Sequence, residues 1–187
     1  GRGRAPANDE PLPPRRRHHE HAAMYLPAGP ARPDPRALEA FWAEAQAACP
    51  GAIHAPRCSV RWIGLDAPTT RQIFDLIRIG DKRGTFGLPW IYERTAQPDP
   101  VRGDCIALID FDGTPTMLVE LGAVYRIAFG DITARDTAID GAPVRDPAIW
   151  KPLHTQYWDG LLTPFGLRVT PDMPVWIEPF ELRYERR

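Results

Sequence analysis

The residues most suited to chemistry are Lys82 and Thr85, which stand three positions apart in the segment 80–85 (GDKRGT). Lys82 is one of only two lysines in a chain that otherwise takes its positive charge from arginine. On an extended segment, an amine and a hydroxyl at this spacing can reach one small pocket. An ammonium there can lower the pKa of a neighbouring hydroxyl, or bind an anion or a carbonyl directly. The pair is therefore a candidate for nucleophilic chemistry or for ligand binding.

Two elements must position this segment. An apolar stripe at helical spacing predicts a helix from about residue 66 to Gly80, directly before the pair. Residues 85–93 read as extended, so the pair lies at a junction between elements, where functional residues often lie. On such a strand Trp90 and Tyr92 share one face, and Glu93 points the other way. Glu93 is equally consistent with a site carboxylate and with a solvated strand end.

The remaining pattern predicts an α+β fold. Helices are predicted from Arg36 to Pro50 and from Asp146, an acceptor cap that precedes Pro147. Strands are predicted over residues 58–63, 105–111, 117–129 and 174–184, with a hairpin turn at Asp112-Gly113. Short helices among about five or six strands indicate a curved or barrel-like sheet.

The N-terminal residues differ from the rest in composition. Residues 1–36 hold eight of the 22 prolines and seven arginines, but few large apolar side chains. Such a segment buries too little surface to offset its ordering entropy. We predict a disordered tail over 1–35 and one folded domain over 36–187. The arginine- and histidine-rich run at 15–21 suggests RNA or metal binding, but a solvated tail explains it more simply. Whether Met24 is the true start stays open.

Composition limits the classes of function. The net charge of −1 over 187 residues argues against broad coating of duplex nucleic acid, which needs a basic face. No apolar run approaches the length of a membrane span, so we expect no membrane partner. Three unpatterned cysteines indicate reduced thiols and a cytoplasmic protein. No cluster has metal-ligand spacing, so no cofactor is predicted, although a divalent ion could join carboxylates at a ribonuclease site.

Several motifs, in this order, resemble the ASCH domain family, small barrels related to the PUA fold. They are residues 37–44, the run from Gly80-x-Lys82-x-x-Thr85 to Trp90-x-Tyr92-Glu93, Gly103-Asp104, residues 149–154 and residues 170–175. Together they cover roughly residues 36–184 and are similar to the longer bacterial members. The resemblance implies a PUA-like β-barrel flanked by short helices, and a function that involves RNA.

Two activities follow from the resemblance. Some family members resemble ribonucleases acting on single-stranded RNA. A shorter branch hydrolyses the acetyl amide of N4-acetylcytidine with a lysine, a threonine three residues later and a downstream glutamate. Lys82 and Thr85 match the first two positions, whereas the third region offers Asp140 instead of glutamate. The short branch also carries a basic residue where this chain has Gly87.

Amide hydrolysis assigns each of these residues a role. The Thr85 hydroxyl would attack the carbonyl, and Lys82 would act as base if it lost its proton, or stabilise negative charge if it kept it. Asp140 or Glu93 would orient the lysine or handle a second proton. This reading makes Lys82, Thr85, Asp140 and Glu93 the predicted catalytic residues.

RNA cleavage would use other neighbours. Arg83 would help Lys82 to stabilise the transition state, and His154 or a carboxylate would act as base. Trp90 and Tyr92 could hold a nucleobase by stacking, although burial of Trp90 in the core is at least as consistent. His154 lies beside an apolar stripe predicted from Trp150, Leu153, Tyr157 and Leu161, where a structural histidine is common.

Two hypotheses therefore compete. The first is a hydrolase that acts on single-stranded RNA or a modified nucleoside, and the second is a non-catalytic RNA- or nucleotide-binding module with a regulatory role. A regulator that binds a small metabolite is a weaker third. The sequence leaves the substrate, the metal requirement and the oligomeric state open.

Overall fold

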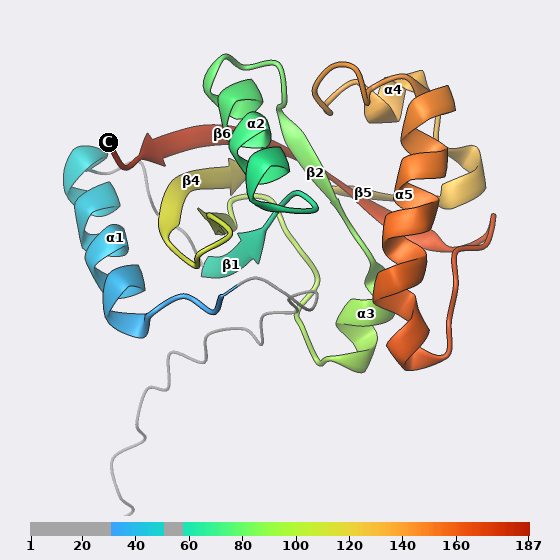
Figure 1. Ribbon diagram of the computed structural model, residues 1–187, viewed down its shortest axis with the longest axis horizontal. Coiled ribbons are helices and arrows are strands. Elements are labelled where there is room, and N and C mark those ends of the chain that lie inside the picture. The colour runs from blue at the N-terminus through green and yellow to red at the C-terminus, as the bar shows by residue number, and fades with distance from the viewer. Residues whose placement is uncertain (1–30, 51–57) are drawn as a thin grey trace, which may run out of the picture.

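The computed structural model describes residues 31–50 and 58–187, which form a six-stranded mixed sheet with helices around it (Figure 1). The strands are β1 (Cys58–Trp62), β2 (Gly84–Gly87), β3 (Cys105–Ile109), β4 (Pro115–Leu121), β5 (Tyr125–Ala128) and β6 (Pro174–Glu185). The helices are α1 (Pro35–Ala48), α2 (Ala67–Arg78), α3 (Pro89–Arg94), α4 (Ala134–Thr137) and α5 (Pro147–Leu162), with short 3₁₀ turns at Phe129–Asp131 and Thr163–Phe165.

The strand order is β1-β3-β4-β6-β2, and β5 also pairs with β6. Among the described strands, β1 and β3 pair in parallel, and the other pairings are antiparallel. The long strand β6 joins the two parts of the sheet, because one half pairs with β4 and the other with β2 and β5. The result is a half-barrel of the PUA-like α+β class, which confirms the predicted fold.

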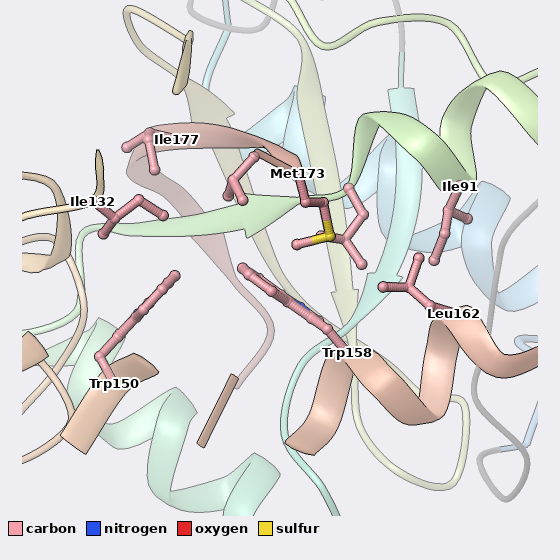
Figure 2. Close-up of a cluster of buried hydrophobic side chains, with 9 residues drawn as sticks. Ile91, Ile132, Trp150, Trp158, Leu162, Met173 and Ile177 are labelled. Atoms are coloured by element: carbon pink, nitrogen blue, oxygen red, sulfur yellow. The ribbon is translucent and has the colours of Figure 1, made fainter. Parts of the chain in front are cut away.

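Apolar side chains fill both parts of this half-barrel. In one part, α2 packs its buried residues against one face of β3 and β4, and α1 packs against the opposite face of the same strands. In the other part, α5 packs against the start of β6. Figure 2 shows Trp150, Trp158 and Leu162 of α5 facing Met173 and Ile177 in this second cluster. The helix that carries His154 is therefore anchored by large aromatic side chains.

The three longest helices begin within one residue of their predicted starts. Asp34, Asp66 and Asp146 each accept a backbone N–H of the first turn, and a proline stands at the first or second position of each helix. Gly80 follows α2 with φ +77°, a conformation that glycine adopts without strain.

The prediction that residues 85–93 are extended is wrong for the second half of this segment. Strand β2 ends at Gly87, and α3 begins at Pro89, whose ring fixes a helical φ. Trp90 and Tyr92 therefore do not share a strand face.

Two further elements differ from the prediction. The return strand 117–129 is two strands, because the chain leaves β4 at Leu121 and then pairs with β6 as β5. On α5 the fully covered positions are Trp150, Trp158 and Leu162, whereas Leu153 is 36 % exposed. The predicted stripe is thus rotated, and Leu153 lies at a cavity described below.

The predicted disordered tail falls mostly on residues 1–30, outside the described part of the chain. Within the described residues, no helix combines the length and the apolar character needed to cross a membrane.

Candidate functional site

A cavity of about 280 Å³ lies between α2 and α5, the two helices on either side of β2 in Figure 1. Its polar and charged lining comes from six elements or loops: Arg61, Thr69, Gln72, Lys82, Thr85, Asp140, His154 and Tyr157. Apolar and aromatic side chains, including Phe86, Trp158, Leu65 and Leu153, form the rest of the wall. The cavity thus combines an aromatic wall with a few convergent polar groups, as ligand sites commonly do.

Lys82 and Asp140 form a buried ion pair on this wall. The Lys82 Nζ lies 2.6 Å from the Asp140 Oδ1, and the two side chains are only 7 % and 11 % exposed. The local fold brings them together, because the N–H of Arg83 donates to the carbonyl of Ile139 at 2.8 Å. This bond holds the loop after α4 beside the start of β2.

Asp140 is held from two further directions. The Trp150 indole N–H donates to Oδ2 at 3.1 Å, and the backbone N–H of Gly141 donates to Oδ1 at 3.1 Å. A carboxylate that accepts several bonds in a buried site has one fixed orientation. The Lys82 ammonium is therefore presented to the cavity in a defined position.

Thr85 lies on β2 and also lines the cavity. It is buried, and its cross-strand partner in the antiparallel pair with β6 is Glu178. Because directly opposed residues share a face, Glu178 projects to the same side of the sheet as Thr85. The structure thus brings the predicted lysine and threonine to one cavity.

A second buried ion pair was missed by the sequence analysis. Arg61 of β1 forms a bidentate pair with Glu178 of β6; its Nη2 donates to Oε1 at 2.9 Å, and its Nη1 donates to Oε2. Glu178 is fully buried, while 20 % of the Arg61 side chain is exposed. Burial alone would lower the pKa of Arg61, but the charge and hydrogen bonds of Glu178 outweigh it and raise that pKa. The available signal was a charged residue in β1 and another in the apolar first half of β6, which marks each residue but not their contact.

His154 is the fourth predicted site residue in the cavity. Its ring stacks on Trp150 at 3.9 Å between centroids, and its Nδ1 lies 2.9 Å from the Trp150 carbonyl oxygen. Burial lowers the pKa of His154 to about 4, and Lys82 also lowers it, against the opposing effects of the Trp150 carbonyl and Asp140. His154 is therefore neutral at pH 7.

The other predicted residues lie away from the cavity wall. Arg83 and Glu93 are exposed. Trp90 packs partly buried against the aromatic cluster of α5. Tyr92 places its ring beside the Arg61 guanidinium, 5.8 Å from the ring centroid, and burial raises the pKa of its hydroxyl. The structure thus gathers Lys82, Thr85, Asp140 and His154, and separates them from Arg83, Trp90, Tyr92 and Glu93.

The described residues contain no group of three or more histidine, cysteine, aspartate or glutamate side chains arranged to hold a metal ion. The polar groups that line the cavity include the ammonium of Lys82, the guanidinium of Arg61, the hydroxyl of Thr85, the carboxylate of Asp140 and the imidazole of His154.

Comparison with known proteins agrees with this architecture. An ASCH domain from Lactobacillus crispatus superimposes with a TM-score of 0.72 at 19 % identity, covering 80 % of this chain and 96 % of that one. A protein of Enterococcus faecalis superimposes with a TM-score of 0.67 at 18 % identity, covering 79 % and 88 %. No curated protein matches the sequence significantly. The sequence profile of the ASCH domain matches residues 62–184, more than half of the chain. The chain therefore belongs to the ASCH domain family.

Proposed function

We propose that the cavity binds a base-sized group of single-stranded RNA or of a modified nucleoside, and that Lys82, Thr85 and Asp140 hydrolyse an amide there. ASCH domains are generally linked to RNA binding, which supports the ligand class. The observation that carries the proposal is the buried contact between Lys82 and Asp140 on the cavity wall that Thr85 also lines.

The dimensions of the cavity favour a small ligand. Its volume of about 280 Å³ is near the lower end of small-molecule sites, which span roughly 300–1,000 Å³. A single ring with a short substituent fits such a volume, whereas a duplex does not. The aromatic side chains Phe86, Tyr157 and Trp158 offer flat apolar surface to such a ring.

The polar groups can divide the steps of amide hydrolysis. The Thr85 oxygen forms a bond to the carbonyl carbon, and the carbon–nitrogen bond breaks as the amine leaves with a proton. Water then releases the acyl group from Thr85. Because Lys82 is paired with a carboxylate, its role is to stabilise the developing oxyanion. Asp140 orients Lys82, and as a carboxylate that lines the same cavity it would accept the hydroxyl proton.

One observation favours a second candidate, a binding module without chemistry. Both oxygens of Asp140 already accept protein donors, from Lys82, Gly141 and Trp150. A carboxylate satisfied in this way can serve to hold Lys82 as a fixed hydrogen-bond donor. In that case the cavity recognises a carbonyl and leaves it intact.

One set of assays separates the two candidates. Purified protein is incubated with N4-acetylcytidine and, separately, with a single-stranded oligoribonucleotide, with and without Mg²⁺ or Mn²⁺. Thr85→Val removes the hydroxyl with little change of shape, and Thr85→Ser restores it. We expect turnover by the wild type and by Thr85→Ser, and at least about a hundredfold loss in Thr85→Val.

The second lysine provides the matched control. Lys151 donates to the carbonyl of Gly130 and does not line the cavity, so Lys151→Ala should retain full turnover. Ligand binding without turnover in the wild type would support the binding module. Neither binding nor turnover with either substrate would contradict both candidates.

A further inference from the structure

Arg61 is the second cation of the cavity wall, and the proposed reaction does not use it. Glu178 accepts one N–H from each terminal nitrogen of its guanidinium. A guanidinium carries five N–H groups in one plane, so this pairing leaves further donors that Glu178 does not take. Arg61 lines the cavity, whereas Glu178 lies fully buried behind it. The Arg61 guanidinium is therefore a hydrogen-bond donor that a buried carboxylate holds in place and that faces the cavity.

Several contacts fix the plane of this guanidinium. Glu178 is anchored on β6 opposite Thr85 of β2. A Cβ at Gly87 would lie 3.2 Å from the Glu178 Oε1 and 3.3 Å from the Tyr92 hydroxyl, so the glycine leaves room for both groups. The Tyr92 ring lies beside the guanidinium. A planar fork held in this way cannot be reproduced by lysine, which is a flexible point charge.

The charges at the cavity wall balance. Among the described residues that line it, the charged side chains are Arg61, Lys82 and Asp140. Lys82 is paired with Asp140, and Arg61 is paired with Glu178 directly behind the wall. The cavity thus offers strong hydrogen-bond donors without an excess of positive charge. An anion entering it would lose its hydration without gaining an unpaired cation.

We propose that Arg61 is a recognition residue that donates hydrogen bonds to an acceptor oxygen or nitrogen of the ligand, and that Glu178 makes the site select uncharged ligands over anionic ones. This inference rests on the proposed function of the same cavity. It implies that the base enters the cavity and that the phosphates of an RNA strand stay outside it.

The test compares two probes by titration calorimetry: cytidine, which carries no hydrolysable acyl group, and 5-carboxycytidine, its anionic counterpart. We expect the wild type to bind cytidine at least about tenfold more tightly. Arg61→Lys, which keeps the charge but loses the fork, should weaken cytidine binding at least about tenfold. Arg183→Lys is the control, because Arg183 pairs with Glu120 on the same sheet and does not line the cavity.

Glu178→Gln tests the selection against anions. It keeps the shape of the side chain but removes the negative charge that Glu178 places against Arg61, so the preference should reverse in favour of 5-carboxycytidine and become sensitive to salt. A role of Glu178 in stability alone would not reverse the preference. If this variant does not fold, the double variant Arg61→Met/Glu178→Leu replaces the pair with apolar groups. It should lose cytidine binding without gaining affinity for the anion.

The outcomes distinguish the two proposals. Equal cytidine affinity in the wild type and in Arg61→Lys, or an unchanged preference in Glu178→Gln, would overturn this inference and leave the proposed function standing. In the double variant, retained cytidine binding would have the same consequence. A wild type that binds neither cytidine nor N4-acetylcytidine would overturn both.

Discussion

The two buried ion pairs of the cavity differ in what holds them. Arg61 and Glu178 project from β1 and β6, strands that β3 and β4 separate in the sheet order, so their pairing reaches across the open side of the half-barrel. Lys82 and Asp140 lie outside regular elements, before β2 and after α4. The first pair joins residues of two strands of the sheet, and the second depends on a loop and on Trp150. We therefore expect the first to matter more for stability and the second more for chemistry.

Removal of Glu178 should give the largest effect on stability. In Glu178→Ala the Arg61 guanidinium keeps its place in the fold but loses its carboxylate, and the free energy of unfolding should fall by about 3–5 kcal/mol in urea denaturation. Glu181→Ala, on the same strand, removes an ion pair to Arg183 in which the glutamate side chain is 73 % exposed. That control should lose less than about 1 kcal/mol. Similar losses in the two variants would contradict the distinction.

Replacement of Lys82 should cost less stability and more activity. Lys82→Met leaves Asp140 with the donors of Trp150 and Gly141, so we expect a loss of about 2–4 kcal/mol, below that of Glu178→Ala. The same variant should lose turnover or carbonyl binding almost entirely. A folded Lys82→Met protein with full turnover would show that the ammonium has no part in the chemistry.

The stability of the folded chain should depend on pH through His154. Unfolded, this histidine binds its proton near pH 6.5, whereas the folded pKa is about 4. Between these values the unfolded state binds more protons, so the contribution of neutral His154 is present above about pH 6.5 and is lost as the pH falls towards 4.

The matched variant for this titration is His154→Gln, which does not titrate. Between pH 7 and pH 4 the wild type should lose up to about 3 kcal/mol more than the variant in chemical denaturation. Parallel pH profiles of the two proteins would mean that His154 titrates normally in the fold.

The smallest expected effect is the coupling between Trp150 and Asp140. A double-mutant cycle of Trp150→Phe and Asp140→Ala separates their hydrogen bond from the packing lost with the indole, and the coupling energy should be about 1–2 kcal/mol. Coupling near zero would remove Trp150 as a support of the carboxylate, and the second pair would then depend on the loop alone.

Local signals explain why part of the fold could be predicted. The start of α5 could be predicted from the acceptor cap Asp146 and from Pro147, because the cap and the ring act within one turn. Asp34 and Asp66 cap α1 and α2 in the same way. The short helix α3 has no side-chain cap and only six residues, too few to show a helical period. It was therefore predicted as a continuation of β2.

The candidate site also has a part that could be predicted from the sequence and a part that could not. Lys82 and Thr85 are three residues apart, so their meeting in one cavity could be expected from spacing and family resemblance. Arg61 and Glu178 are 117 residues apart, and their contact depends on the curvature of the whole sheet. Neither residue type nor local pattern carries that information. Tyr92 was assigned to the site for its strand face, and the helix α3 places it behind Arg61 instead.

The position of β6 has a consequence for biosynthesis. This strand is the partner of β2, β4 and β5, and it contributes Glu178. Ribosomes make the chain from its N-terminus, so β2, β4 and β5 are synthesised before their common partner strand. The half-barrel can form only after β6 has been synthesised. Until then, Arg61 lacks the carboxylate of Glu178, and the sheet that supports the cavity is incomplete. A nascent chain halted before residue 174 should therefore be unable to hold a ligand.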